Sequence, residues 1–370
     1  MNTPLPCIDW VQGGGVCMNR KREWSTVAAT LAAAAGAGFS SGREIVFFFA
    51  QMGWASWIGV GFASAMYGAL CGIICHFAKM TGGETLPGVY LRVLGARQGT
   101  VVCALYGLLM AVAAGVMIVT TGELAALALP LRNAFWMGAL FSTGLALLLS
   151  MHGMRRMAAL GAVTVILCAV FHIALALDPR EVSIYHRYET VPELSGSVTA
   201  ALLLSTLHAA LSASLSGGAV AGFSGRTESP VRFTVRCGVG MLVLLVSANA
   251  AIMRGGERLL SQALPTVVLA ARWGTFGYYA SILTMWLCSL TTLCAALGAI
   301  AGQMNDGRSA RRVMVAVLLL GVLAAMLLGI EHFVELGYPM LGWAGAFSLA
   351  GLVCCFEIGS RSKPAGRRKL

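Results

Sequence analysis

Residues 36–44 read G-A-G-F-S-S-G-R-E, and they interrupt the first strongly apolar segment of the chain. Alanine-rich apolar sequence precedes them at 27–35, and apolar sequence resumes as I-V-F-F-F at 45–49. Neither piece alone approaches the about 20 residues that a membrane-spanning helix needs. Glycine lets the backbone leave the helix, and backbone freed at membrane depth persists only where it lines a cavity or a site. The stretch therefore predicts a broken helix beside a substrate or ion site; the alternative is a short span, a turn and a second short segment.

The composition indicates an integral membrane protein. Of the 370 residues, 58% are hydrophobic and 11% are charged, and the mean hydropathy is +0.79. A soluble domain carries roughly 25% charged residues. The formal net charge of +11 does not indicate a nucleic-acid partner, because the basic residues are spread through short loops without a basic face interleaved with aromatic residues. The predicted partner is the lipid bilayer.

Apolar runs of about 18 to 25 residues predict ten membrane-spanning helices in an all-α membrane protein. They lie near residues 25–50 (the broken helix), 54–78, 99–122, 134–151, 157–177, 197–224, 233–253, 274–303, 311–330 and 335–357. If the N-terminus is cytoplasmic, most of the 26 Lys and Arg residues fall in inner loops. This asymmetry predicts a multi-pass protein of the plasma or inner membrane with both termini in the cytoplasm.

The predicted organisation is a single membrane domain between two tails. Residues 1–22 are expected to form an N-terminal cytoplasmic tail, 23–358 the transporter-like membrane domain, and 359–370 a basic cytoplasmic tail. The first sixteen residues lack a signal-peptide pattern, and Met18 is an alternative start. Two stretches too short to cross, 84–94 and 258–270, are expected to cap the inner and outer faces. The eleven cysteines show no ligand spacing, so neither a metal site nor a disulfide is predicted.

Ten spans divide into two halves of five, about 23–178 and 196–358. Because five is an odd number, the second half would cross the membrane in the opposite orientation to the first. The first helix of the second half also carries polar and small residues, among them Ser205, Thr206, His208, Ser216 and Gly217. Matching interruptions in corresponding helices are typical of inverted-repeat transporters. The sequence therefore predicts a 5+5 inverted repeat with broken first and sixth helices.

Several polar residues are candidates for a substrate site. From the first helix, Gly36, Gly38, Ser40 and Ser41 are expected to face Ser205, Thr206 and His208 of the sixth across a small polar pocket. Charged residues at membrane depth must pair or face water. Glu44 is expected to bind substrate or a proton and Arg43 to act as an outer gate, while an internal Arg43–Glu44 salt link that fixes the broken helix is the structural alternative.

Three pieces carry a resemblance to a known family: G-A-G-F-S-S-G-R-E-I-V-F-F-F at 36–49, the pair Thr291-Thr292, and G-Y-P-M-L-G at 337–342. The chain resembles the YkvI-like bacterial membrane proteins of the amino acid–polyamine–organocation superfamily, which have the LeuT-type fold. The resemblance covers roughly residues 23–358. It implies a secondary transporter by fold, and it leaves the substrate open, because the substrates of that family are not generally established.

The resemblance also implies sodium as a coupling ion, with no other cofactor. Its ligands would be the carbonyls of Ala32, Ala35 and Cys288 and the hydroxyls of Thr291 and Thr292, between the broken first helix and the eighth. Hydroxyl and carbonyl oxygens are the donors that hard cations prefer. In the alternative interpretation, the two threonines bond to carbonyls of their own helix.

Taken together, these features favour a secondary transporter of a small polar solute, an amino acid or related amine, coupled to sodium or protons. A receptor with a transporter fold, which binds a solute without moving it, shares the same sequence features. An intramembrane serine hydrolase is disfavoured, because serine and histidine would have to lie on facing helices in a context that this chain lacks. No enzyme activity is expected, and the sequence gives no oligomeric state.

Overall fold

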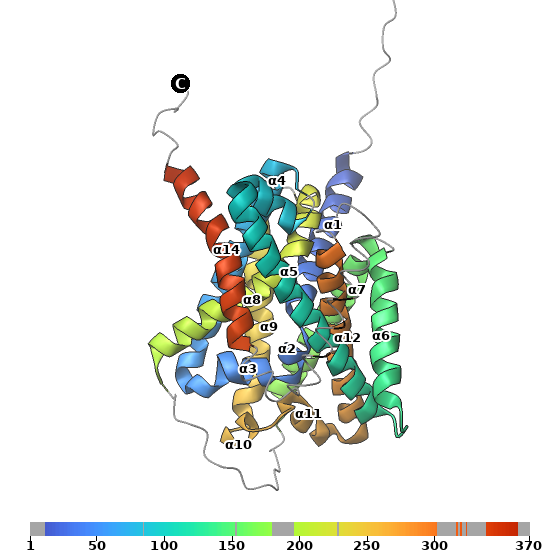
Figure 1. Cartoon of the computed structure of the whole chain (residues 1–370). Coiled ribbons are helices and arrows are strands. Elements are labelled where there is room, and N and C mark those ends of the chain that lie inside the picture. Colours follow the sequence, from blue (N-terminus) through green and yellow to red (C-terminus); the bar gives the residue numbers. More distant parts are fainter. Residues whose placement is uncertain are drawn as a thin grey trace, which may run out of the picture.

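The computed structural model describes residues 12–83, 85–151, 154–179, 196–227, 229–301 and 338–361, and the isolated residues Ala316, Leu319 and Leu323. Within these ranges all regular structure is helical, and the long helices pack side by side as one bundle (Figure 1). Seven helical stretches are long and apolar enough to cross a membrane. They are Ala50–Thr81, Leu86–Ala128, Met157–Leu177, Val198–Phe223, Pro230–Arg254, Pro265–Ile300 and Pro339–Glu357.

The long helices lie where the apolar runs predicted them. In the first half they are α4 (Ser56–Thr81), α5 (Leu86–Ala128), α6 (Ala134–Met151) and α7 (Met154–Leu177). In the second half they are α8 (Val198–Phe223), α9 (Pro230–Arg254), α12 (Gly274–Ala301) and α14 (Tyr338–Arg361). The predicted span at 311–330 lies outside the described residues except for Ala316, Leu319 and Leu323, so ten spans remain a prediction.

The first predicted span is broken, as expected. It consists of α1 (Gln12–Ala34), α2 (Ala37–Ser41) and α3 (Arg43–Phe48), followed by the short turn η1 (Ala50–Ala55). Gly36 is extended, and Gly42 has a φ of 83°, a left-handed conformation that favours glycine. The helix begins at Gln12, within the segment predicted as a tail.

The predicted break in the sixth helix is wrong: α8 is one continuous helix of 26 residues. Its hydroxyl groups bond to carbonyls one turn back, Thr206 Oγ1 to Leu202 O at 2.8 Å and Ser216 Oγ to Ser212 O at 2.8 Å. These bonds satisfy the side chains without opening the helix. Its glycines serve packing instead, since a Cβ on Gly217 would lie 2.5 Å from Leu86 Cδ2 of α5.

Short helices cover both ends of the bundle. On α5, Gly95 (φ 78°) separates a first segment beginning at Leu86 from the membrane-spanning part, which matches the short stretch predicted at 84–94. The stretch predicted at 258–270 contains most of α10 (Glu257–Leu260) and all of α11 (Pro265–Ala270); η2 (Ser224–Arg226) and η3 (Ala271–Trp273) are single turns. The start of α1 and the end of α14 lie at one end of the bundle, and α10 and α11 lie at the other (Figure 1). Which end faces the cytoplasm stays a prediction.

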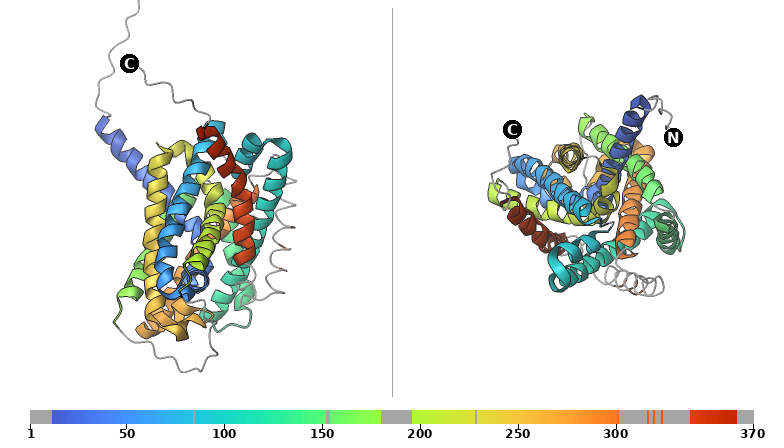
Figure 2. Two further views of the ribbon diagram at one scale, coloured as in Figure 1. Left: turned by 90° about the vertical axis from the view of Figure 1, so that its left-hand side faces the viewer. Right: turned by 90° about the horizontal axis from the view of Figure 1, so that it is seen from above.

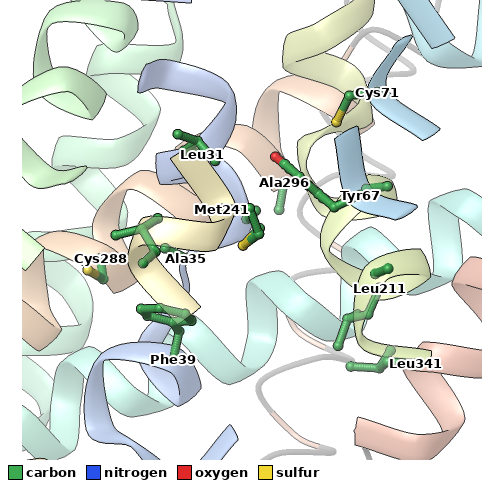
Figure 3. Close-up of a cluster of buried hydrophobic side chains, with 14 of the residues drawn as sticks. Leu31, Ala35, Phe39, Tyr67, Cys71, Leu211, Met241, Cys288, Ala296 and Leu341 are labelled. Atoms are coloured by element: carbon green, nitrogen blue, oxygen red, sulfur yellow. The ribbon is translucent and has the colours of Figure 1, made fainter. Parts of the chain in front are cut away.

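Helices α1 and α8 occupy the centre of the bundle. Helix α1 packs against α7, α8, α9 and α12, and α8 packs also against α4, α5 and α14; the left-hand view of Figure 2 shows α4 and α14 on either side of α8. Figure 3 shows part of the buried core, with Leu31, Ala35 and Phe39 from the broken segment near Cys288 of α12. The break in the first helix therefore lies inside the protein and not against lipid.

Candidate functional site

The break leaves backbone carbonyls at the end of α1 that need partners. In a continuous helix the Gly36 amide would donate to Ala32 O, but here it donates to Ala34 O at 3.0 Å. Two hydroxyls from α12 bond to the freed carbonyls: Thr291 Oγ1 lies 3.1 Å from Ala32 O, and Thr292 Oγ1 lies 3.3 Å from Ala33 O. The threonine pair thus meets the broken backbone directly.

Of the five residues that the resemblance implies for sodium, Ala32, Cys288, Thr291 and Thr292 meet at this contact, and no hydrogen bond in the described part of the chain joins Ala35 to it. Thr291 Oγ1 also lies 2.9 Å from Cys288 O, so the carbonyl oxygens of Ala32 and Cys288 both lie next to the Thr291 hydroxyl. Thr292 contacts the carbonyl of Ala33, whereas the resemblance implied the carbonyls of Ala32 and Ala35 as the first-helix ligands. A Cβ on Gly36 would lie 3.4 Å from Thr292 Oγ1, which places the extended residue against the same hydroxyl. Thr291 Oγ1 also lies 3.2 Å from Leu287 O, so its single proton is shared between Ala32 O and two carbonyls of its own helix, and the alternative of bonding within α12 holds in part for Thr291.

A buried carboxylate and a buried imidazole meet between α3 and α8. Glu44 Oε1 lies 3.0 Å from His208 Nε2, and the two side chains are 6% and 1% exposed. The contact is within ion-pair distance, but it lacks hydrogen-bond geometry, and no other described atom bonds to either ring nitrogen. The sequence placed both residues in the site without pairing them.

Aromatic rings enclose the Glu44–His208 pair. The His208 ring lies edge-on to Phe48 at 5.3 Å and to Phe49 at 4.9 Å between centroids. Phe48 follows Glu44 by four residues, so both side chains lie on one face of α3. Phe48 and Phe49 are fully buried. A carboxylate beside aromatic rings is a combination that binds organic cations.

Arg43, the predicted gate, connects the broken helix to the cap at the α10–α11 end. Its Nη1 donates to the carbonyl of Leu260, the last residue of α10, at 2.9 Å and lies 3.4 Å from the carbonyl of Gln262, in the connection between α10 and α11. Nearby, a Cβ on Gly42 would lie 2.8 Å from Thr266 Oγ1 and 2.7 Å from Ile252 Cδ1. The turn before α3 is therefore held closely by this cap and by α9.

The remaining predicted site residues do not form one pocket. Ser40 Oγ bonds to Gly36 O at 3.2 Å and Ser41 Oγ to Gly38 O at 3.0 Å, so both hydroxyls are used within the broken segment. Helix α2 packs against α11 and α12, whereas α3 packs against α8 and α9.

On α8, Ser205 bonds to its own helix at Ala201 O and faces α4, because a Cβ on Gly59 would lie 2.6 Å from Ser205 Oγ. Thr206 is half-buried and bonds to its own helix. Of the α8 candidates, His208 alone has a recorded polar contact with the broken segment.

Sequence reasoning missed the polar contacts that join α4 to its neighbours. Tyr67 Oη lies 3.2 Å from Ser216 Oγ of α8 and 3.4 Å from Thr30 O of α1, and Asn249 Nδ2 of α9 donates to Ser56 Oγ at 3.1 Å. A tyrosine or asparagine inside an apolar run is the signal that could have indicated them. His172, which the sequence favoured as a structural residue, has Nδ1 2.8 Å from Cys168 O of its own helix, while its buried Nε2 has no hydrogen-bond partner among the described residues.

Among solved structures, the chain is similar to a manganese transporter of Eremococcus coleocola. The complex of that transporter with an aromatic bis-isothiourea substituted compound has a TM-score of 0.53 and 14% identity, over 96% of this chain and 80% of that chain. Two point mutants of the same transporter have a TM-score of 0.52 with the same identity and coverage. No family profile and no curated protein sequence matches the chain. These similar structures are transporters and not enzymes, and at 14% identity the likeness shows the fold alone: the chain is a multi-span membrane protein with a LeuT-like fold.

Proposed function

We propose that the protein is a secondary transporter of a small polar solute, which it moves by alternating access. The observation that carries this proposal is the buried break in the first helix, where the Ala32 and Ala33 carbonyls leave the helical pattern and meet Thr291 and Thr292. Freed backbone at membrane depth is the feature with which secondary transporters coordinate their cargo. The LeuT-like fold supports the same class.

The substrate class that fits the chemistry is an amino acid or related amine. An ammonium group could replace the imidazole as the partner of the Glu44 carboxylate, and the rings of Phe48 and Phe49 would face it. Cations are attracted to aromatic faces and to carboxylates, most strongly where water is excluded. The resemblance to the YkvI-like family remains part of this proposal.

Divalent metal is the competing cargo, because the similar solved structure is a manganese transporter. In the described part of the chain no group of three or more His, Cys, Asp or Glu side chains could hold a metal ion. Glu44 and His208 supply two such ligands only. An amine, which needs one carboxylate, fits these residues better than a divalent cation does.

Sodium is the proposed coupling ion at the Thr291–Thr292 contact. The hydroxyls bond to carbonyls of α1 and, for Thr291, also to Cys288 O of α12. Rotation of the two O–H bonds away from these carbonyls would leave the hydroxyl and carbonyl oxygens free to bind a cation. Coupling to protons through the Glu44–His208 pair is the alternative. His208→Asn keeps a hydrogen-bonding side chain and removes titration, so an unchanged pH profile of uptake in this variant would exclude His208 as the proton carrier.

The test begins with a thermal-stability screen of the purified protein against amino acids, amines and Mn²⁺, each in sodium and in choline. A ligand of the native state raises apparent stability by mass action. We expect an amine to stabilise the protein, and more strongly in sodium. Stabilisation by Mn²⁺ and by no amine would overturn the substrate class, and equal effects in sodium and choline would overturn the sodium site.

Uptake of the stabilising solute into proteoliposomes then separates the two functional classes. A transporter accumulates the labelled solute when a sodium or proton gradient is imposed. Binding without uptake under both gradients would instead identify a receptor with a transporter fold. The Glu44→Gln variant is the control, since it should lose both binding and uptake of an amine.

A further inference from the structure

Four hydroxyl side chains meet between α5, α8 and α14, away from the site described above. This hydroxyl cluster consists of Tyr90 and Tyr106 of α5, Ser214 of α8 and Ser348 of α14, all fully buried. The two tyrosine rings lie edge-on with centroids 6.0 Å apart. Ser214 Oγ lies 3.3 Å from Ser348 Oγ, and Ser348 Oγ donates to Gly345 O at 2.8 Å.

Among the residues that the structure describes, neither phenolic hydroxyl has a hydrogen-bond partner. Tyr106 Oη lies near the backbone of Gly218, and Tyr90 Oη lies near Ser348, but neither contact has hydrogen-bond geometry. No other described atom bonds to either hydroxyl. Buried polar groups in native proteins are almost always bonded, and an orphaned one points to a water or a ligand. The two unbonded tyrosine hydroxyls lie on either side of Gly95, where α5 is kinked, and beside two serine hydroxyls. This arrangement indicates an occupant that both hydroxyls share.

One face of α5 connects the hydroxyl cluster to the break in the first helix. A Cβ on Gly36 would lie 3.7 Å from Met117, and a Cβ on Gly218 would lie 3.4 Å from Tyr106 Oη. Met117 and Tyr106 are eleven residues apart, which is roughly 16 Å along a helix. Tyr90 is the fifth residue of α5, and α5 begins at the end of the bundle where α1 begins (Figure 1). The same face of α5 therefore borders both the hydroxyl cluster and the break in the first helix.

The chemistry of the cluster is neutral. Its members are hydroxyls and the Gly345 carbonyl, which can accept and donate hydrogen bonds but carry no charge. We propose that the hydroxyl cluster holds ordered water and forms a hydrated stage on the route between the break and the end of the bundle where α1 begins. On this route it would bind a neutral hydrogen-bonding group of the solute, and that part of the proposal rests on the proposed transport.

Thiol accessibility tests the hydration directly. Ser214→Cys and Ser348→Cys are made in a background with Cys7, Cys17, Cys103, Cys354 and Cys355 replaced by serine, and the protein in nanodiscs is treated with methanethiosulfonate ethylammonium. The matched controls are Ala213→Cys and Leu349→Cys, which are buried neighbours on the same helices. We expect the two serine positions to react at least about tenfold faster than the controls, because the thiolate forms only where water reaches. Equal, slow reaction at all four positions would overturn the proposal.

Tyrosine-to-phenylalanine substitutions give a second, independent measurement. If water bonds to the hydroxyls, Tyr90→Phe and Tyr106→Phe lower the thermal midpoint, as Tyr67→Phe should through its bonds to Ser216 and Thr30. If the hydroxyls are dry, their removal raises the midpoint in both variants, and the proposal fails. Fast thiol labelling without solute uptake would refute transport and leave the hydrated site standing, whereas uptake with slow labelling would do the reverse.

Discussion

The first helical segment and α8 carry similar residues, yet one is broken and the other is continuous. Residues 36–44 contain three glycines and two serines, and α8 contains serines, two threonines and glycines of its own. In the first segment Gly36 is extended and Gly42 is left-handed, whereas α8 is helical from Val198 to Phe223. Small polar residues therefore permit a break but do not cause one.

The first segment and α8 differ in the groups that bond to their backbone carbonyls. At the break, two threonines on α12 replace the lost helical bonds of Ala32 and Ala33. On α8, the hydroxyls of Thr206 and Ser216 turn back to their own helix. A break is stable in the membrane only where a neighbour supplies donors for the freed carbonyls.

Removing the contact that joins the two regions should have the largest effect. His208→Ala leaves the buried Glu44 carboxylate without its partner, and such a loss costs up to about 3–5 kcal/mol. We expect a strong fall in unfolding free energy, measured by denaturation in detergent. A double-mutant cycle with Glu44→Gln should show coupling. Absence of coupling would mean that the 3.0 Å contact contributes nothing.

His172→Ala is the matched control for that cycle. It removes a buried imidazole whose Nδ1 lies near its own helix at Cys168 O, so a similar cavity results. It should destabilise the protein but show no coupling to Glu44→Gln, because sites without shared partners are additive. Coupling of the same size in this control would assign the effect to general loosening of the bundle.

Glycine substitutions should separate the break from the continuous helix. Gly42→Ala forces a Cβ into a left-handed conformation and within 2.8 Å of Thr266 Oγ1, so we expect a loss of about 1–3 kcal/mol. Gly218 has a helical backbone conformation, and the added Cβ of Gly218→Ala would lie 3.4 Å from its nearest neighbours, Ala299 Cβ and Tyr106 Oη. This variant should therefore be neutral or slightly stabilising. Thermal midpoints of the two variants provide the comparison. Equal losses would contradict the structural difference between the two regions.

Hydroxyl removal should matter at the break and hardly at all on α8. Thr291→Val leaves Ala32 O without its donor, at a cost of about 1–3 kcal/mol for a buried group. Thr206→Val removes a hydroxyl that bonds to a carbonyl of its own helix and should change stability by less than about 0.5 kcal/mol. If both valine variants unfold at the wild-type midpoint, the threonine does not stabilise the break.

The sequence predicted the helices well, because apolar length is a strong signal in a membrane protein. The family resemblance implied that Thr291 and Thr292 lie against the broken first helix, where they contact Ala32 and Ala33, and the sequence itself identified Glu44 and His208 as candidates. The predicted break in α8 was wrong, because glycines and serines occur both at helix breaks and at close helix contacts. The neighbouring helix that decides between the two lies far away in the sequence. The hydroxyl cluster was missed for the same reason, because Tyr90 and Ser348 are separated by most of the chain.

Hydrogen–deuterium exchange of the amides in residues 31–45 and 205–222 tests the central claim, that the first helix is an open, ligand-responsive element and α8 is not. The account predicts that the first peptide exchanges at least about tenfold faster than the second, because the amides at a break lack helical partners. It also predicts that the stabilising solute slows exchange in the first peptide only. Equal, slow exchange in both peptides, with and without the solute, would contradict it.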